Sequence, residues 1–299
     1  MSNTWTTQDL IDDILLLGHV PIGNNTFTEA RVLRLATLEL QTSVMKQILS
    51  TRGGYYLSYE DRTIETDGIY PIPSGAVAGS LENIELISGE SITQCNMIAE
   101  TDADASSCGF FLKGNYIQIL PTPTLGSVRL WFTKRTSDLV LTSAASQITA
   151  VNGAVISVSS IPSTISTGKT IDACGDQSPF NILGTRVISG ISGTDITLAS
   201  SVDDLAIGDW LALSGQTPIP QIPVEYRIIL AQRVVVKVYE MQNNLEKMKA
   251  AQMKLLEYEK DVMNLITPRV KSQTKVISTI QGGFLSGSSG RFSKFQATP

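Results

Sequence analysis

The sequence predicts an α+β protein, in which a helical bundle with a long C-terminal helix carries a small β layer, an inserted all-β domain and a flexible C-terminal tail. Three observations support this fold class. Apolar residues recur at helical spacing near both ends of the chain, the alternation typical of strands replaces that spacing in the middle, and the final segment is rich in Gly and Ser.

Two helices are expected in the N-terminal segment. Thr7 can cap the first, whose apolar face includes Leu10. The second begins after Thr26 or Thr28 and continues to about Ser50. Both helices have a broad apolar face, so we expect them to pack on a third helix.

Residues 53–139 predict the small β layer. Within this range, residues 114–135 read GNYIQILPTPTLGSVRLWFTKR, which is two alternating runs separated by Pro121 and Pro123. Proline cannot donate an N–H to a sheet, so we expect the two prolines to mark the turn of a hairpin. This hairpin is expected to brace the long C-terminal helix.

Residues 142–217 differ from the neighbouring segments in composition and in the spacing of their turn residues. Short Val- and Ile-rich strands lie in a background of Ser and Thr, glycines fall at nearly regular turn spacing, and Asn152-Gly153 is typical of a tight hairpin turn. We interpret this range as an inserted sandwich or barrel. The predicted domains are therefore the first part of an adaptor core at 1–141, the inserted β domain at 142–217, the long helix of the core at 218–266, and an extended docking tail at 267–299.

The longest predicted helix runs from Val224 to about Ile266 and stops before Pro268. At 1.5 Å per residue it would span about 65 Å if it were unbroken. Two shorter helices and a β insertion cannot cover an apolar row of that length. We therefore expect the C-terminal half of this helix to contact other subunits through Leu245, Met248, Leu255 and Val262.

The tail, residues 267–299, contains five Lys or Arg residues and no Asp or Glu, whereas the whole chain carries a net charge of −5. An acidic body argues against a protein that grips nucleic acid over its whole surface. Separated aromatic and basic side chains are typical of a segment that becomes ordered on a partner. The expected docking side chains are Phe284, Leu285, Arg291, Phe292 and Phe295.

The sequence predicts no catalytic, cofactor-binding or metal-binding site. The single histidine, His19, is interpreted as a loop residue, because no partners for a metal site or a catalytic triad can be identified. The segment STGKT at 166–170 lacks the leading glycine of a phosphate-binding loop. Three scattered cysteines are too few for a disulfide framework and are expected to be reduced.

The chain has no apolar run near the roughly 20 residues that a membrane span needs. Its N-terminus also lacks the basic flank and cleavable apolar region of a signal peptide. We therefore expect a folded cytosolic protein without a membrane partner.

The order of the predicted elements resembles the head-to-tail connector, or portal adaptor, proteins of tailed bacteriophages. The resemblance covers residues 5–139 and 220–266, and it rests on two N-terminal helices, the segment YPIPSGAVAGSLENIEL, the pair GNYIQILPTPTLGSVRLWFTKRTSDLVL and a late long helix. The inserted β domain departs from the small adaptors.

This resemblance implies a structural virion protein at the head–tail junction, assembled in the host cytoplasm. Its copies would form a dodecameric ring beneath the portal protein and would join it to the tail nozzle or other tail proteins. Genomic DNA would pass through the ring without sequence-specific binding. An acidic body suits such a conduit, because it repels phosphates.

Two other readings remain open. The protein is a tail or baseplate component if its β domain binds a host glycan, in which case Trp210 and Phe180 are the large aromatic candidates for the contact. An enzyme would need a carboxylate site built from distant segments, and no paired motif in the sequence indicates one.

Overall fold

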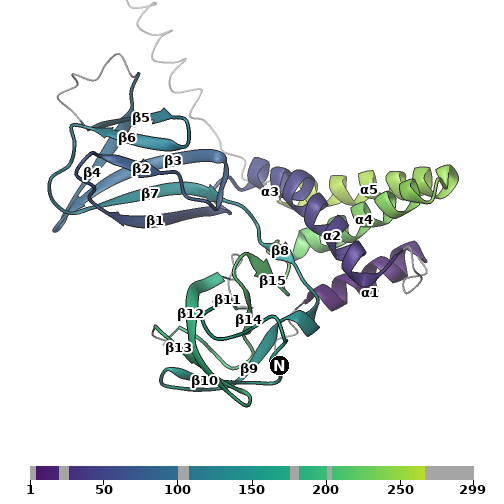
Figure 1. Cartoon of the computed structure of the whole chain (residues 1–299). Coiled ribbons are helices and arrows are strands. Elements are labelled where there is room, and N and C mark those ends of the chain that lie inside the picture. The colour runs from purple at the N-terminus through teal and green to yellow at the C-terminus, as the bar shows by residue number, and fades with distance from the viewer. Residues whose placement is uncertain (1–4, 20–26, 100–107, 176–181, 201–203, 267–299) are drawn as a thin grey trace, which may run out of the picture. The chain divides into compact units, whose positions relative to one another are not determined.

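The computed structural model describes residues 5–19, 27–99, 108–175, 182–200 and 204–266 (Figure 1). Strands contain 36% of these residues and helices 33%. The prediction of a helical bundle with a small β layer is therefore wrong, because the chain builds a large curled sheet and a closed barrel in addition to its helices. Short strands joined by irregular loops carry a weak local signal, and only their pairing reveals the size of a sheet.

The first β unit is a seven-stranded sheet in the order β1-β7-β3-β4-β5-β6-β2. Its neighbours are antiparallel except for β4 and β5, which run parallel. Alternate residues of the strands form one apolar core, which includes Ile84, Ile117 and Leu130. The strands are β1 (Leu57–Thr63), β2 (Ile69–Pro71), β3 (Ala76–Ser88), β4 (Ser91–Met97), β5 (Gly109–Lys113), β6 (Tyr116–Leu120) and β7 (Ser127–Lys134).

The predicted hairpin at residues 114–135 does not form. Strands β6 and β7 exist, but β6 pairs with β5 and β2, whereas β7 pairs with β1 and β3. The segment with Pro121 and Pro123 therefore connects two separated positions in the sheet instead of making a tight turn. The alternation correctly indicated two strands, but it carries no information about which strands are neighbours.

The second β unit is a closed six-stranded barrel in the order β10-β13-β12-β11-β14-β9. Its interior is filled by aliphatic side chains such as Ile148, Ile171 and Leu211. The hairpin β9–β10 turns immediately after Asn152, which pairs with Val155. The strands are β9 (Ser146–Asn152), β10 (Val155–Val158), β11 (Thr170–Cys174), β12 (Ile182–Ser192), β13 (Asp195–Leu198) and β14 (Trp210–Leu213).

The chain enters and leaves the barrel at one place. Strand β8 (Asp138–Leu139) precedes the barrel, strand β15 (Gln216–Thr217) follows it, and the two pair in parallel. The Val140 N–H also donates to the Thr217 carbonyl at 3.1 Å. Short one-turn helices lie next to this crossing, at η3 (Thr142–Ala144) and η4 (Val224–Tyr226).

The N-terminal helices are α1 (Thr7–Gly18) and a continuous helix made of α2 (Glu29–Glu39), η1 (Leu40–Val44) and α3 (Met45–Thr51). Thr6, and not Thr7, caps α1, because its side chain accepts from the Asp9 N–H while the Asp9 carboxylate accepts from the Thr6 N–H. The cap of α2 is Thr28, one of the two starts that the sequence left open.

The prediction of a single long C-terminal helix is also wrong. The chain forms two helices, α4 (Arg227–Met241) and α5 (Leu245–Ile266), separated by Gln242–Asn244. Asn243 has a φ of 54°, a left-handed conformation that Asn adopts more readily than most residues, and the Asn244 side chain accepts from the Lys247 N–H at the start of α5. Helix α5 then folds back on α4, and the Gln232 side chain donates to the Ala251 carbonyl at 3.0 Å.

The cysteines differ from expectation as well. Cys95 of β4 and Cys108, which directly precedes β5, form a disulfide, whereas Cys174 is free and buried. The parallel pairing of β4 with β5 brings the two Cα atoms to 4.7 Å. The expectation that all three cysteines are reduced is therefore wrong, because this pairing depends on the sheet and not on cysteine spacing.

Candidate functional site

Two places in the described chain combine features that suggest a role beyond folding. One is the outer flank of helix α5, and the other is a cavity where the sheet, the barrel and the helix α2–η1–α3 meet. The residues discussed at both places lie in the first of the two compact units of the chain, which ends at Val262.

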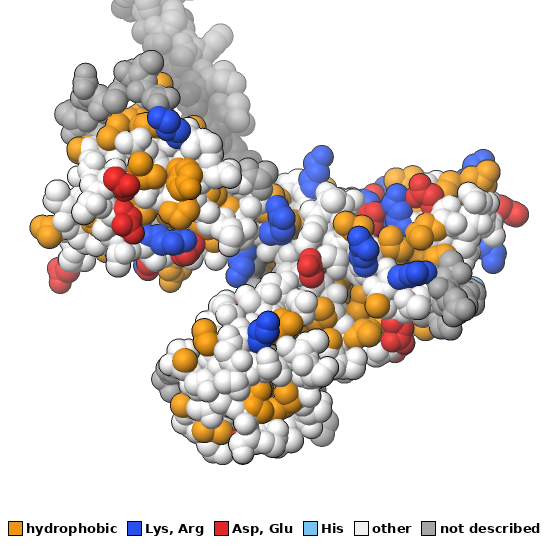
Figure 2. All heavy atoms as spheres, viewed as in Figure 1, with side chains coloured by type: hydrophobic (Ala, Val, Ile, Leu, Met, Phe, Trp, Pro, Cys, Tyr) orange, Lys and Arg blue, Asp and Glu red, His pale blue; other side chains and the backbone are white. Residues whose placement is uncertain are grey.

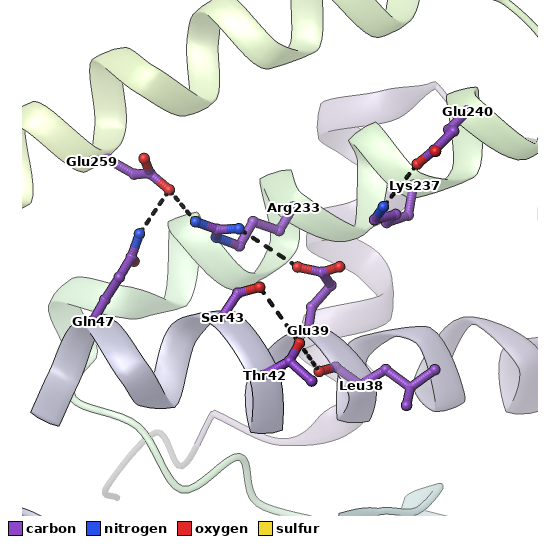
Figure 3. Close-up of polar contacts among 9 residues, drawn as sticks. All are labelled: Leu38, Glu39, Thr42, Ser43, Gln47, Arg233, Lys237, Glu240 and Glu259. Atoms are coloured by element: carbon purple, nitrogen blue, oxygen red, sulfur yellow. Dashed lines mark hydrogen bonds and ion pairs between the residues drawn. The ribbon is translucent and has the colours of Figure 1, made fainter.

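Helix α5 is held in place by a polar cluster around Arg233 of α4 (Figure 3). The Arg233 guanidinium donates to the Glu259 carboxylate at 2.5 Å and lies 3.6 Å from the Glu39 carboxylate. Gln47 donates to the same Glu259 oxygen at 2.9 Å. These side chains are mostly buried, so the cluster fixes α5 against both α4 and the N-terminal helix.

The π-helical turn η1 explains how one helix supplies two members of this cluster. A π turn contains one more residue than an α turn. Glu39 and Gln47 are eight residues apart, and the added residue places them about as residues seven apart would lie in a regular helix, which share a face. Figure 3 shows both side chains directed toward α4 and α5.

The interface residues predicted on the long helix differ in how exposed they are in the structure. Leu245 is 64% exposed, Met248 and Leu255 are half-buried, and Val262 is 8% exposed. The row from Met248 to Val262 therefore faces the chain's own helices, because α5 folds back. Phe284, Leu285, Arg291, Phe292 and Phe295 lie outside the described residues, as do the tail and Phe180.

A second apolar row on α5 was missed from the sequence. Met253 is 73% exposed and Leu256 is 66% exposed. At about 100° per residue, Leu245, Met253 and Leu256 lie within about 80° of one another, beside the inward row. We call these three residues the α5 flank. The sequence of α5 shows an apolar arc that is wider than one contact row. The prediction of a single straight helix gave no reason to separate this arc into a buried row and an exposed row.

The second place is a cavity of about 580 Å³ that we call the junction pocket. Strands β1 and β7 supply Ser58, Phe132 and Lys134, which share one face of the sheet according to the β1–β7 register. The barrel side supplies Asp172, Thr185 and Gly215. The Lys134 N–H donates to the Tyr56 carbonyl at 2.8 Å within the sheet wall, and the Asp138 N–H donates to the Gly215 carbonyl at 2.8 Å beside the barrel.

The barrel wall of the pocket contains a buried carboxylate. Along β11, Ile171 and Ala173 point into the barrel core, so Asp172 points outward, where it is only 4% exposed. Its two oxygens accept from the Thr185 hydroxyl at 2.7 Å and from the Gly215 N–H at 2.8 Å. These two bonds stabilise a charge that burial would otherwise make costly.

The sheet wall of the pocket contains a partly buried amine. Burial lowers the pKa of Lys134 below its ordinary value, and the nearby charge of Asp172 offsets only part of that effect. Among the residues that the structure describes, no carboxylate lies within ion-pair distance of the Lys134 amine. A desolvated cation in a cavity is a common feature of binding sites.

The other sequence candidates do not form sites. His19 lies exposed at the C-terminal end of α1, and residues 166–170 form a turn and the start of β11 instead of a strand leading into a helix. The described part of the chain holds no group of three or more metal-ligating side chains. Within the described ranges, no helix combines the length and the apolar character that a membrane crossing requires.

The geometry defines a mixed α and β protein with a curled sheet, a closed barrel and a helical hairpin. No protein-family model matches the chain, and no curated protein sequence matches it either.

Proposed function

We propose that the protein is a structural subunit of a homo-oligomeric virion assembly, the head-to-tail connector of a tailed bacteriophage. The observation that carries the proposal is the α5 flank, an apolar row that remains exposed after the other apolar face of α5 has been covered by the chain's own helices. Burying one such side chain stabilises a complex by about 1.5–3 kcal/mol, so a row of three favours a contact.

The occupant that we propose for the α5 flank is a second copy of the chain. Helix α5 carries four lysines and four acidic residues, so its net charge does not repel another α5. The Arg233 cluster also holds the helix in one position, which lowers the entropy cost of forming a repeated contact. Figure 2 shows hydrophobic and charged side chains interspersed over the helices, as in the rim and core of many interfaces.

The sequence resemblance supplies the class of assembly. In that arrangement the helices form the wall of a ring, the tail at 267–299 attaches the ring to the portal protein, and genomic DNA passes through the lumen. The glycan-binding alternative gains no support from the described barrel, in which Trp210 is the single aromatic residue and is half-buried.

The test is the mass of the purified full-length protein, with its particles imaged in negative stain. We expect a ring-shaped oligomer for the unchanged chain and a folded monomer for M253D/L256D, because two buried charges in the contact cost several kcal/mol. A matched control is K254D, since Lys254 is exposed and lies about 100° or more around the helix from each residue of the α5 flank. Rings formed by M253D/L256D would exclude the α5 flank as the contact, and a monomeric or dimeric unchanged protein would exclude the connector.

A further inference from the structure

In the junction pocket, the acidic side chains have hydrogen-bond or ion-pair partners, but the lysine amine does not have an ion-pair partner among the described residues. Its acidic side chains are already occupied: Asp172 accepts two hydrogen bonds, Asp138 accepts from Gln41 at 3.1 Å, and Glu60 pairs with Arg62 at 2.8 Å. The Lys134 amine, in contrast, has no ion-pair partner in the described part of the chain.

A second donor near this amine also lacks an acceptor. Thr136 is 2% exposed, and its hydroxyl has no hydrogen-bond partner among the described residues. Lys134 and Thr136 are two positions apart, and both line the cavity. The unmet requirement of the pocket is therefore an acceptor, and a negatively charged one suits the amine best.

We propose that the junction pocket binds a carboxylate group, with the Lys134 amine as its ion-pair partner. This proposal does not depend on the connector function. The planar, bidentate acceptor fits beside the apolar Phe132 ring, which is itself 5% exposed and limits access of water to the pair. A phosphate fits less well, because Asp172, Glu60 and Asp138 would repel its larger charge.

Two sources could present this carboxylate. One is a small organic acid free in solution. The other is an acidic side chain on an extended peptide that lies along β1, since β1 is an edge strand whose residues Ser58–Glu60 line the pocket. An added strand would supply main-chain hydrogen bonds in addition to the ion pair. Both sources present a carboxylate to the Lys134 amine, and the experiment below distinguishes them.

The test measures binding of two probes to the full-length protein by titration calorimetry at neutral pH and low salt. The probes are succinate and a short Ser/Thr peptide with one central Glu. We expect at least one probe to bind with a dissociation constant of about 1 mM or lower, in line with one charge-assisted contact and its neighbours. Tighter binding of the peptide identifies a polypeptide partner, and tighter binding of succinate identifies an organic acid.

Matched variants assign the site. We expect K134M, which keeps an apolar stem, to weaken binding at least tenfold, and K169M, which changes an exposed lysine, to leave it unchanged. Binding to the unchanged protein should also weaken as the pH rises and the Lys134 amine loses its proton, which needs no variant. The proposal would be overturned if neither probe bound, if inorganic phosphate bound as tightly as the better probe, or if K134M bound the probe as tightly as the unchanged protein.

Discussion

Arg233 of α4 and Glu259 of α5 form a direct ion pair with a nitrogen-to-oxygen distance of 2.5 Å, although 26 residues separate them in the sequence. The pair exists only because the chain reverses between the two helices. The ion pair holds α5 against α4, and it therefore fixes the position of the α5 flank on which the proposed assembly depends.

Loss of the Arg233 guanidinium should destabilise the protein. In R233L, Glu39 and Glu259 lose their cation while both remain mostly buried, so we expect the free energy of unfolding to fall by about 2–3 kcal/mol. The control is K237L, which removes a lysine that pairs with Glu240 on the exposed surface and should change stability by less than about 1 kcal/mol. Urea unfolding monitored by circular dichroism measures both. Equal effects of the two variants would show that the cluster does not hold α5.

The turn between α4 and α5 requires a residue that tolerates a positive φ. Replacing Asn243 with Ala should cost about 1 kcal/mol, because a side chain with a Cβ and no local hydrogen bond is disfavoured in the left-handed region. Replacing it with Gly should leave stability within about 0.5 kcal/mol of the original. Thermal unfolding of the two variants makes the comparison. If Ala is tolerated as well as Gly, a continuous helix through this position becomes the better description.

Thiol reactivity should separate the three cysteines. In the native oxidised protein an alkylating reagent should modify none of them rapidly, because Cys95 and Cys108 are joined and burial raises the pKa of the Cys174 thiol to about 12. Reduction under native conditions should make the half-buried Cys108 thiol available, and unfolding should expose the buried Cys95 and Cys174. Mass spectrometry of the alkylated protein counts the sites. Rapid modification of Cys108 before reduction would contradict the disulfide.

Removing the disulfide should also lower stability. The bridge closes a loop of 13 residues, so we expect C95A/C108A to lose about 2–3 kcal/mol relative to the oxidised protein. Reduced unchanged protein is the natural control, since it lacks the bond but keeps both side chains. If reduced and oxidised proteins unfold at the same urea concentration, the bond does not contribute to the stability of the sheet.

The stability effect of Lys134 should depend on pH. Burial places its folded-state pKa below the ordinary value of 10.5, so between these two values the unfolded chain binds a proton that the folded chain does not. Stability therefore rises with pH in that window, and the full cost of the buried charge is present at lower pH. We expect K134M to be more stable than the unchanged protein at neutral pH, with a difference that shrinks toward pH 10.5. A difference that is constant with pH would show that the amine is not desolvated.

Most of the local elements can be predicted from the amino-acid sequence alone. A start after Thr26 or Thr28 and the apolar spacing that follows predicted the second helix, alternation within residues 114–135 predicted two strands, and Asn152-Gly153 predicted the β9–β10 hairpin. These signals are local, because capping, side-chain period and turn geometry depend on neighbouring residues.

The neighbours of these elements depend on how distant segments pack. The tertiary structure placed β6 and β7 apart, paired β4 with β5 so that Cys95 meets Cys108, and turned one apparent helix into two at Asn243. That reversal buried Val262, left Met253 and Leu256 exposed, and thereby changed which face of α5 is open to a partner. The junction pocket brings Lys134 to within electrostatic range of Asp172 across 38 residues of sequence. Periodicity shows which face of an element is apolar, but only the packing of distant segments shows what covers that face.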